Sequence, residues 1–262
     1  MLENKNIRLI QGDCLEALAL LKEEDVKVQV VITDPPYGTT KCKWDSVIPL
    51  DIMWASLYGV SYPNTSYIFT ASQPFTTTLI SSNLKYFKYS LVYEKTTPTG
   101  HLNAKIMPLR CHEDILVFGK GKIAYNPQKT TGHIRKVSSA KSKAKSISAY
   151  NSRDKVYNNE NELAFKDYDS TERYPRSVLK FSTDKQKSTL HPTQKPVELM
   201  KYLIKTYANK GDTILDFTMG SGTTGVAVAE LNRDENLDLK FIGIELDENY
   251  FNIAKDRIES IV

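Results

Sequence analysis

The tetrapeptide Asp34-Pro35-Pro36-Tyr37 contains residue types that can hold a planar amino group for reaction. Prolines have no backbone N–H and keep an extended path, so the carbonyls of this segment stay available to a ligand. An amino nitrogen carries two hydrogens, which the Asp34 carboxylate and the Pro35 carbonyl would accept, directing the nitrogen lone pair toward an electrophile. Tyr37 would stack against the ring that bears the amine. The alternative interpretation is a proline turn that closes a strand.

A glycine-rich turn, Gly220-x-Gly222-x-x-Gly225, follows Asp216 and precedes an apolar helix. Glycines permit a tight turn and let a ligand approach the backbone at the start of a helix. Glu245 stands 20 residues after Gly225, a spacing that suits an acid receiving two ribose hydroxyls. This part of the chain therefore predicts a nucleoside-containing cofactor, and on this evidence an NAD-dependent oxidoreductase is one candidate.

Four apolar segments rich in β-branched residues each stop at an acid, as expected of buried strands. They are Ile7–Asp13, Val28–Asp34, Thr213–Asp216 and Phe241–Glu245. Amphipathic helices are predicted at residues 15–24, 196–209, 223–232 and 248–260. The fold class is therefore α/β, a mostly parallel sheet with helices on both faces. Ligands bind beyond the carboxyl ends of such strands, so Asp13, Asp34, Asp216 and Glu245 should surround one site.

The middle of the chain has a different pattern. Short strands are predicted at 67–71, 90–94 and 114–119, but from 124 to about 189 the periodicity fades and polar residues dominate. Between His133 and Lys155, seven basic residues stand against the single acid Asp154, and they are Arg135, Lys136, Lys141, Lys143, Lys145, Arg153 and Lys155. Such a segment predicts contact with a polyanion, and the alternative is a solvated flexible loop.

Composition limits the class of protein. With 262 residues and 40% hydrophobic content, the chain fits one globular α/β domain with an inserted lobe. It has neither an apolar run of about 20 residues nor a secretory start, so we expect a cytoplasmic protein without membrane contact. Cys14, Cys42 and Cys111 lack C-x-x-C spacing, so neither a disulfide framework nor a metal site is predicted.

The length of chain after Glu245 separates two cofactors. A dinucleotide would call for a second nucleotide-binding half, whereas 17 residues follow Glu245. S-adenosylmethionine needs one such half and an acidic contact, so we expect this cofactor.

The motifs together resemble those of S-adenosylmethionine-dependent DNA amino-methyltransferases, which have a Rossmann-like class I methyltransferase fold. Residues 214–256 are similar to the first motifs of that family, and His191-Pro192-Thr193-Gln194-Lys195-Pro196 is similar to its H-P-T-Q-K-P segment. Thr218 stands where the family usually has an aromatic residue. The resemblance implies these cofactor-binding residues: Asp13, His191, Thr193, Lys195, Asp216, Thr218, Gly220, Ser221, Gly222, Thr223, Thr224 and Glu245.

The order of the motifs resembles the circularly permuted beta group, whose target-recognition region lies in the middle. The resemblance implies a catalytic part at 1–123, a target-recognition region at 124–189 that carries the seven basic residues, and a cofactor part at 190–262. It also implies double-stranded DNA as substrate, with a homodimer and a cognate restriction endonuclease of a bacterium or phage as candidate partners.

Asp34 in the first motif position favours adenine N6, since cytosine N4 enzymes more often have S-P-P-Y, and cytosine N4 stays the alternative. We expect Asp34, Pro35, Pro36 and Tyr37 to position a flipped base for direct attack without a metal. No cysteine follows a proline, so the nucleophile motif of cytosine carbon-5 enzymes is missing. RNA and protein glutamine amides are other substrates of D-P-P-Y enzymes, and a nucleic-acid-binding protein with an inactive site is a further class.

Overall fold

The computed structural model describes residues 2–3, 6–38, 47–141, 167–182 and 194–261. The chain divides into two compact units, one of residues 1–126 with 176–262 and one of residues 127–175. These boundaries differ from the 124 and 189 expected for the inserted region, because residues 178–181 form a strand of the first unit.

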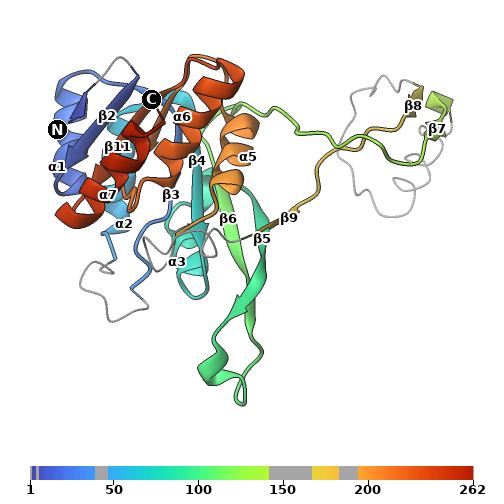
Figure 1. Ribbon diagram of the computed structural model, residues 1–262, viewed down its shortest axis with the longest axis horizontal. Helices are drawn as coiled ribbons and strands as arrows, with labels where there is room; N and C mark the ends of the chain where they lie inside the picture. The colour runs from blue at the N-terminus through green and yellow to red at the C-terminus, as the bar shows by residue number, and fades with distance from the viewer. Residues whose placement is uncertain (1, 4–5, 39–46, 142–166, 183–193, 262) are drawn as a thin grey trace. The chain divides into compact units, whose positions relative to one another are not determined.

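Within the described ranges of the first unit, nine strands form one sheet (Figure 1). In chain order they are β1 (Leu2–Glu3), β2 (Ile7–Gln11), β3 (Val28–Thr33), β4 (Ser61–Ala71), β5 (Phe87–Thr99), β6 (Arg110–Phe118), β9 (Val178–Phe181), β10 (Thr213–Asp216) and β11 (Lys240–Glu245). Their order across the sheet is β1-β2-β11-β10-β3-β4-β6-β5-β9. β2, β11, β10, β3 and β4 run parallel, and β6 is antiparallel to both of its neighbours. The expected mostly parallel α/β fold is confirmed.

The topology brings distant segments together. β10 pairs with β3, with Leu215 opposite Val31, although 184 residues separate them in sequence. β11 pairs with β2 on the other side of β10. Because these strands are parallel, Asp216 at the end of β10 and Asp34 after β3 reach the same edge of the sheet.

Helices cover both faces of the sheet (Figure 1). α1 (Cys14–Glu23), α2 (Leu50–Gly59) and α3 (Phe75–Ser82) pack on one face, and α5 (Val197–Tyr207), α6 (Thr223–Glu235) and α7 (Glu248–Glu259) pack on the other. Alternate strand residues face opposite cores, as the period of a strand requires. In β3, Val30 and Ile32 join the core under α5 and α6, whereas Val31 joins the core under α1 and α2. No helix in the described ranges is long and apolar enough to cross a membrane.

The expected helices are present within three residues of their predicted bounds, and two of them have clear local start signals. The Asp13 side chain accepts from the backbone N–H groups of Leu15 and Glu16, which caps α1. Asp247 caps α7 in the same way through Asn249 and Tyr250. Both acids therefore fix a helix directly after a strand of the sheet.

The helices α2 and α3, the short strands β1 and β9, and the short strands of the second unit were not expected from the sequence. α2 and α3 begin after Pro49 and Pro74 without a side-chain cap, and α3 contains three threonines, which favour strands. Their helical state depends on packing, since Trp54 of α2 and Phe75 of α3 lie buried against the sheet. β9 is only four residues long, and it pairs with β5 at the sheet edge.

The second unit contains a small antiparallel pair, β7 (Lys136–Ser138) with β8 (Tyr168–Ser170). A bridge between Thr130 and Arg173 extends this pairing. Tyr168 donates its hydroxyl to the Glu172 carbonyl at 2.5 Å, and this bond holds the turn after β8.

We expect Gly222→Ala to destabilise the protein more than Gly211→Ala. Both glycines have left-handed backbones, with φ of 78° and 84°. A Cβ on Gly222 would lie 2.7 Å from the Ala254 Cβ on α7, whereas a Cβ on Gly211 would meet nothing within 4 Å. Both variants carry the backbone strain, and only Gly222→Ala adds overpacking, which costs about 1–3 kcal/mol. Urea unfolding of both variants measures the difference, and equal losses would contradict the close contact.

Candidate active site and cofactor pocket

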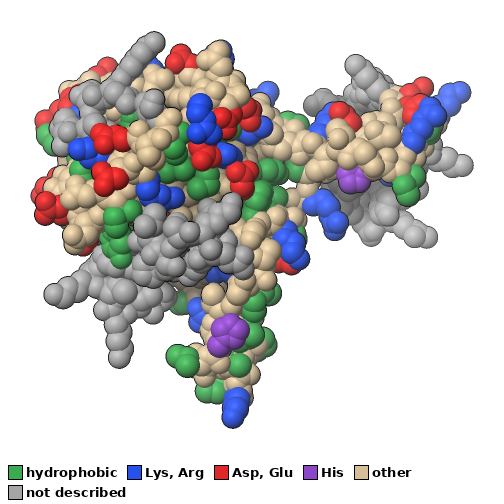
Figure 2. Space-filling view, in the orientation of Figure 1, with side chains coloured by type: hydrophobic (Ala, Val, Ile, Leu, Met, Phe, Trp, Pro, Cys, Tyr) green, Lys and Arg blue, Asp and Glu red, His purple; other side chains and the backbone are tan. Residues whose placement is uncertain are grey.

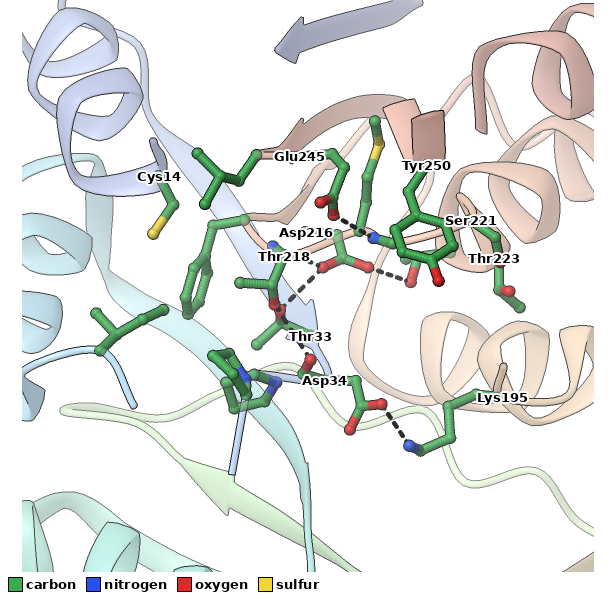
Figure 3. Close-up of a pocket in the computed structure, with 18 of the residues that line it drawn as sticks. Cys14, Thr33, Asp34, Lys195, Asp216, Thr218, Ser221, Thr223, Glu245 and Tyr250 are labelled. Atoms are coloured by element: carbon green, nitrogen blue, oxygen red, sulfur yellow. Dashed lines mark hydrogen bonds and ion pairs between the residues drawn. The ribbon is translucent and has the colours of Figure 1, made fainter. Parts of the chain in front are cut away.

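A cavity of about 460 Å³ lies at the carboxyl ends of the parallel strands (Figure 3). This volume falls in the range of small-molecule sites. Asp13, Asp34, Asp216 and Glu245 all line it, as the sheet argument predicts. The cavity therefore joins the two motif regions that lie far apart in the sequence.

Asp216 is the buried centre of the cofactor side. Thr33 donates to one carboxylate oxygen at 2.9 Å, and Thr224 at the start of α6 donates to the other at 2.6 Å. The backbone N–H of Thr218 adds a third bond at 3.3 Å. Burial raises the pKa of Asp216 to about 7, and the hydroxyl bonds only partly oppose this effect.

Thr218 links the cofactor side to the catalytic side. Its hydroxyl lies 2.6 Å from the Thr33 hydroxyl and donates to the Asp34 carbonyl at 3.3 Å. An aromatic side chain would make neither bond. Phe217 beside it is buried between the sheet and α1–α3, with its ring edge-on to Phe69.

Glu245 fixes the glycine-rich turn. One carboxylate oxygen accepts from the Gly220 N–H at 2.8 Å, and the other accepts from the Asp247 N–H at 2.9 Å. Each oxygen keeps a second lone pair for a ligand hydroxyl. Burial raises the pKa of Glu245. On the far side of the turn, Arg257 of α7 donates to the carbonyl and hydroxyl of Ser221.

Asp34 is held by three donors. One carboxylate oxygen accepts from the hydroxyls of Tyr37 and Thr70, each at 2.5 Å. The other oxygen forms an ion pair with the Lys195 ammonium (Figure 3). The carboxylate is therefore oriented before any substrate binds.

Lys195 connects Asp34 to a second carboxylate. Its Nζ lies 3.2 Å from Glu113, which also pairs with Lys95. Burial works to lower the pKa of Lys195, but Asp34, Tyr37 and Glu113 outweigh it and raise this pKa well above its usual value. Burial likewise opposes ionisation of Glu113, yet the two lysines prevail and lower its pKa to about 2. Lys195 and Glu113 are thus both charged at neutral pH.

Two further side chains limit the chemistry of the cavity. The Tyr37 ring stacks on Phe75 with centroids 5.2 Å apart, so a base can stack only on the other face of Tyr37. Burial raises the pKa of Cys14, which lines the cavity, to about 12. Its thiol is therefore protonated at neutral pH and is a poor nucleophile.

The structure brings together most of the predicted site residues that it describes. Those lining the cavity are Asp13, Asp34, Pro35, Pro36, Tyr37, Lys195, Asp216, Thr218, Gly220, Ser221, Thr223, Thr224 and Glu245. Gly222 serves as the N-cap of α6. His191 and Thr193 lie outside the described residues.

Of the seven basic residues, Arg135, Lys136 and Lys141 are exposed on the second unit. Arg135 binds both oxygens of Asp169 through two hydrogen bonds, so its guanidinium already has an anionic partner. Lys143, Lys145, Arg153 and Lys155 lie outside the described residues.

The sequence did not single out Thr33, Thr70, Lys95 or Glu113 for the site. Glu113 and Thr70 had a signal, because Arg110-Cys111-His112-Glu113 and Ile68-Phe69-Thr70 each resemble a motif of the family, whereas Thr33 looks like an ordinary strand residue. The roles of the two threonines follow from pairing between strands, since Thr33 ends β3 opposite Phe69, the residue before Thr70 on β4.

An open, mostly parallel sheet with an acid-lined cavity beyond its strand ends is typical of enzymes that bind a nucleoside-containing cofactor, among them the class I methyltransferases. The family model for N6/N4 methyltransferases, described as DNA methylase, matches residues 28–256. The chain belongs to this family.

The chain is also similar to individual DNA methyltransferases in sequence and in structure. The type II methyltransferase M.HpaI of Haemophilus parainfluenzae is 29% identical over 268 residues, covering 97% of this chain and 74% of the relative. The crystal structure of an M1.HpyAVI–SAM complex aligns with a TM-score of 0.64 and 25% identity over 96% of this chain and 98% of that one. The cytosine-N4-specific PvuII DNA methyltransferase shares the fold, with a TM-score of 0.61 and 15% identity over 97% and 86%.

The protein is therefore a DNA methyltransferase, and its cofactor is S-adenosylmethionine. The residues present fit this molecule, because an acid that can receive hydroxyls, a glycine turn and a buried carboxylate follow one another along the cavity. The buried Oε1 of Gln194, which also lines the cavity, has no hydrogen-bond partner in the part of the chain that the structure describes. Such an atom is suited to a ligand donor.

We expect Lys195→Met to lower the free energy of unfolding by about 3–5 kcal/mol, because it leaves Asp34 and Glu113 without their shared buried cation. The matched control is Lys180→Met, which removes the exposed ion pair with Glu94 and should cost much less. Urea unfolding at pH 7 compares the two variants. Equal losses would contradict the role assigned to the buried cluster.

Asp216 should make stability depend on pH. Its folded pKa of about 7 lies above the ordinary value of 3.8, so the folded protein keeps a proton that the unfolded chain releases. The contribution of Asp216 to stability therefore falls as pH rises from about 4 to about 7, by about 1.4 kcal/mol per pKa unit. Asp216→Asn should make the measured decline shallower over that window. Parallel curves for the two proteins would contradict this assignment.

Proposed function

We propose that the protein transfers a methyl group from S-adenosylmethionine to the N6 amino group of adenine in double-stranded DNA. The observation that carries the proposal is the Asp34 carboxylate, which three donors orient at the edge of the cavity that also holds Asp216 and Glu245. A fixed acceptor beside a cofactor pocket can orient a planar amine for in-line attack.

We propose that Asp34 and the Pro35 carbonyl each accept one hydrogen of the amine. Tyr37 would hold the base through the ring face that Phe75 leaves open. Because the amine of a paired base is inaccessible, the nucleotide must leave the helix to reach this cavity. The sulfonium of the cofactor supplies the methyl group, and no protein nucleophile is required.

We further propose how the chain holds the cofactor. Glu245 would receive the ribose hydroxyls, and Asp13 at the rim of the cavity would contact the adenine. Asp216 and the turn around Gly220 would flank the methionine part. The buried Asp216 suits a cationic ammonium, because such a partner stabilises the ionised carboxylate that burial disfavours.

Cytosine N4 is the second candidate for the target amine. The PvuII enzyme is named cytosine-N4-specific and shares the fold, so the fold alone does not distinguish the bases. Asp34 in the first motif position, where N4 enzymes more often have serine, supports adenine.

We propose that the second unit, residues 127–175, reads the target sequence. Its support is the seven basic residues between 135 and 155, since lysine and arginine near phosphates release counterions. Because M.HpaI is named a type II methyltransferase, a cognate restriction endonuclease and a bacterial cytoplasm are part of this proposal. A homodimer remains a candidate assembly.

Nucleoside analysis of the product tests the proposal. Unmethylated duplex DNA incubated with the protein and labelled S-adenosylmethionine should yield N6-methyladenine. Asp34→Ala, which removes the carboxylate acceptor, should lower the rate by about 100-fold or more. N4-methylcytosine as the sole product would overturn the base assignment, and label in RNA or protein but not in DNA would overturn the substrate.

A further inference from the structure

A two-stranded arm, defined here as residues 96–112, extends from the sheet of the first unit (Figure 1). Within residues 96–112, β5 and β6 pair only with each other among the described residues, with Thr99 opposite Arg110. The free end of the arm carries three exposed apolar side chains. Leu102 is 101% exposed, Ile106 is 80% exposed and Met107 is 46% exposed.

The free end is ordered by its own backbone. Gly100 adopts a left-handed φ of 89°, and the Asn103 N–H donates to its carbonyl at 2.9 Å. The N–H groups of Ile106 and Met107 then donate to the Asn103 carbonyl at 2.9 and 3.0 Å. The apolar side chains are therefore presented by a hydrogen-bonded turn, and such an exposed group marks an interaction site.

The charge of the arm indicates what it contacts. Residues 96–112 include Lys105, Arg110, His101 and His112 and no Asp or Glu. Figure 2 shows hydrophobic side chains together with a histidine and a basic residue at the free end. A basic, acid-free surface favours a polyanion over a second copy of this chain, whose net charge is +4.

The arm is continuous with the active site. Glu113, which belongs to the Lys195 cluster, lies on β6 three residues from Arg110, or about 10 Å at the usual strand rise. A duplex whose target base enters the cavity would thus lie within reach of the arm.

We propose that the arm inserts Leu102 and Ile106 between base steps of the duplex, where they fill the space that the flipped nucleotide leaves. Apolar side chains such as Leu, Ile and Met unstack base steps in this way, and a basic flank contacts the phosphates. The inference rests on the proposed function, because the space exists only if a base is flipped.

The test uses the recognition sequence found by mapping methylated DNA from the wild-type protein. The double variant Leu102→Ala/Ile106→Ala is compared with Leu84→Ala, a matched control that truncates a leucine 67% exposed outside the arm. Each protein is assayed on an intact duplex and on the same duplex with an abasic residue opposite the target, where the base is already unpaired. Calorimetry with S-adenosylmethionine verifies that all the variants keep the cofactor pocket.

We expect the double variant to lose about tenfold or more in kcat/KM on the intact duplex and to recover most of it on the abasic duplex. Leu84→Ala should match the wild type on both substrates. Unchanged activity of the double variant, or an equal loss on both duplexes, would overturn the inference. A loss that accompanies dissociation of a dimer in sedimentation would assign the arm to a second copy instead. Failure of the wild type to methylate any DNA would refute the proposed function itself.

Discussion

The buried ion cluster of Asp34, Lys195 and Glu113 is the interaction on which the site depends. It joins the end of β3, the strand β6 and the segment that leads into α5, so three distant parts of the chain meet at one ammonium. Burying these charges is costly unless they are paired, and here each carboxylate has a cation. The result is an Asp34 carboxylate with a fixed direction.

A second network couples this carboxylate to the cofactor pocket. Thr33 and Thr218 connect the Asp34 backbone to Asp216 through hydroxyl groups, so hydrogen bonds join the two motifs directly. This explains why Thr218 suits the position where relatives have an aromatic residue. Thr218 offers less surface for packing than an aromatic side chain, but its hydroxyl forms a hydrogen-bonded link between the cofactor pocket and the Asp34 segment.

The sequence predicted the features that repeat along the chain or are carried by local signals. Strands that end at or shortly before acids, the helices α1, α5, α6 and α7, and the convergence of Asp34 and Asp216 all follow from periodicity and from the geometry of parallel sheets. α2 and α3 could not be predicted, because uncapped and threonine-containing segments become helical only through packing. Glu113 also joins the site only through the register of β6.

We propose that one set of residues holds the cofactor and that another, centred on Asp34, positions the amine. The most direct measurement determines S-adenosylmethionine affinity by calorimetry and the single-turnover methylation rate for the same preparation of Asp34→Ala. We expect Asp34→Ala to bind S-adenosylmethionine with an affinity close to that of the wild type and to lose most of its single-turnover methylation rate. A rate that falls only in proportion to a lost affinity, or a rate that stays at the wild-type value, would contradict this proposal.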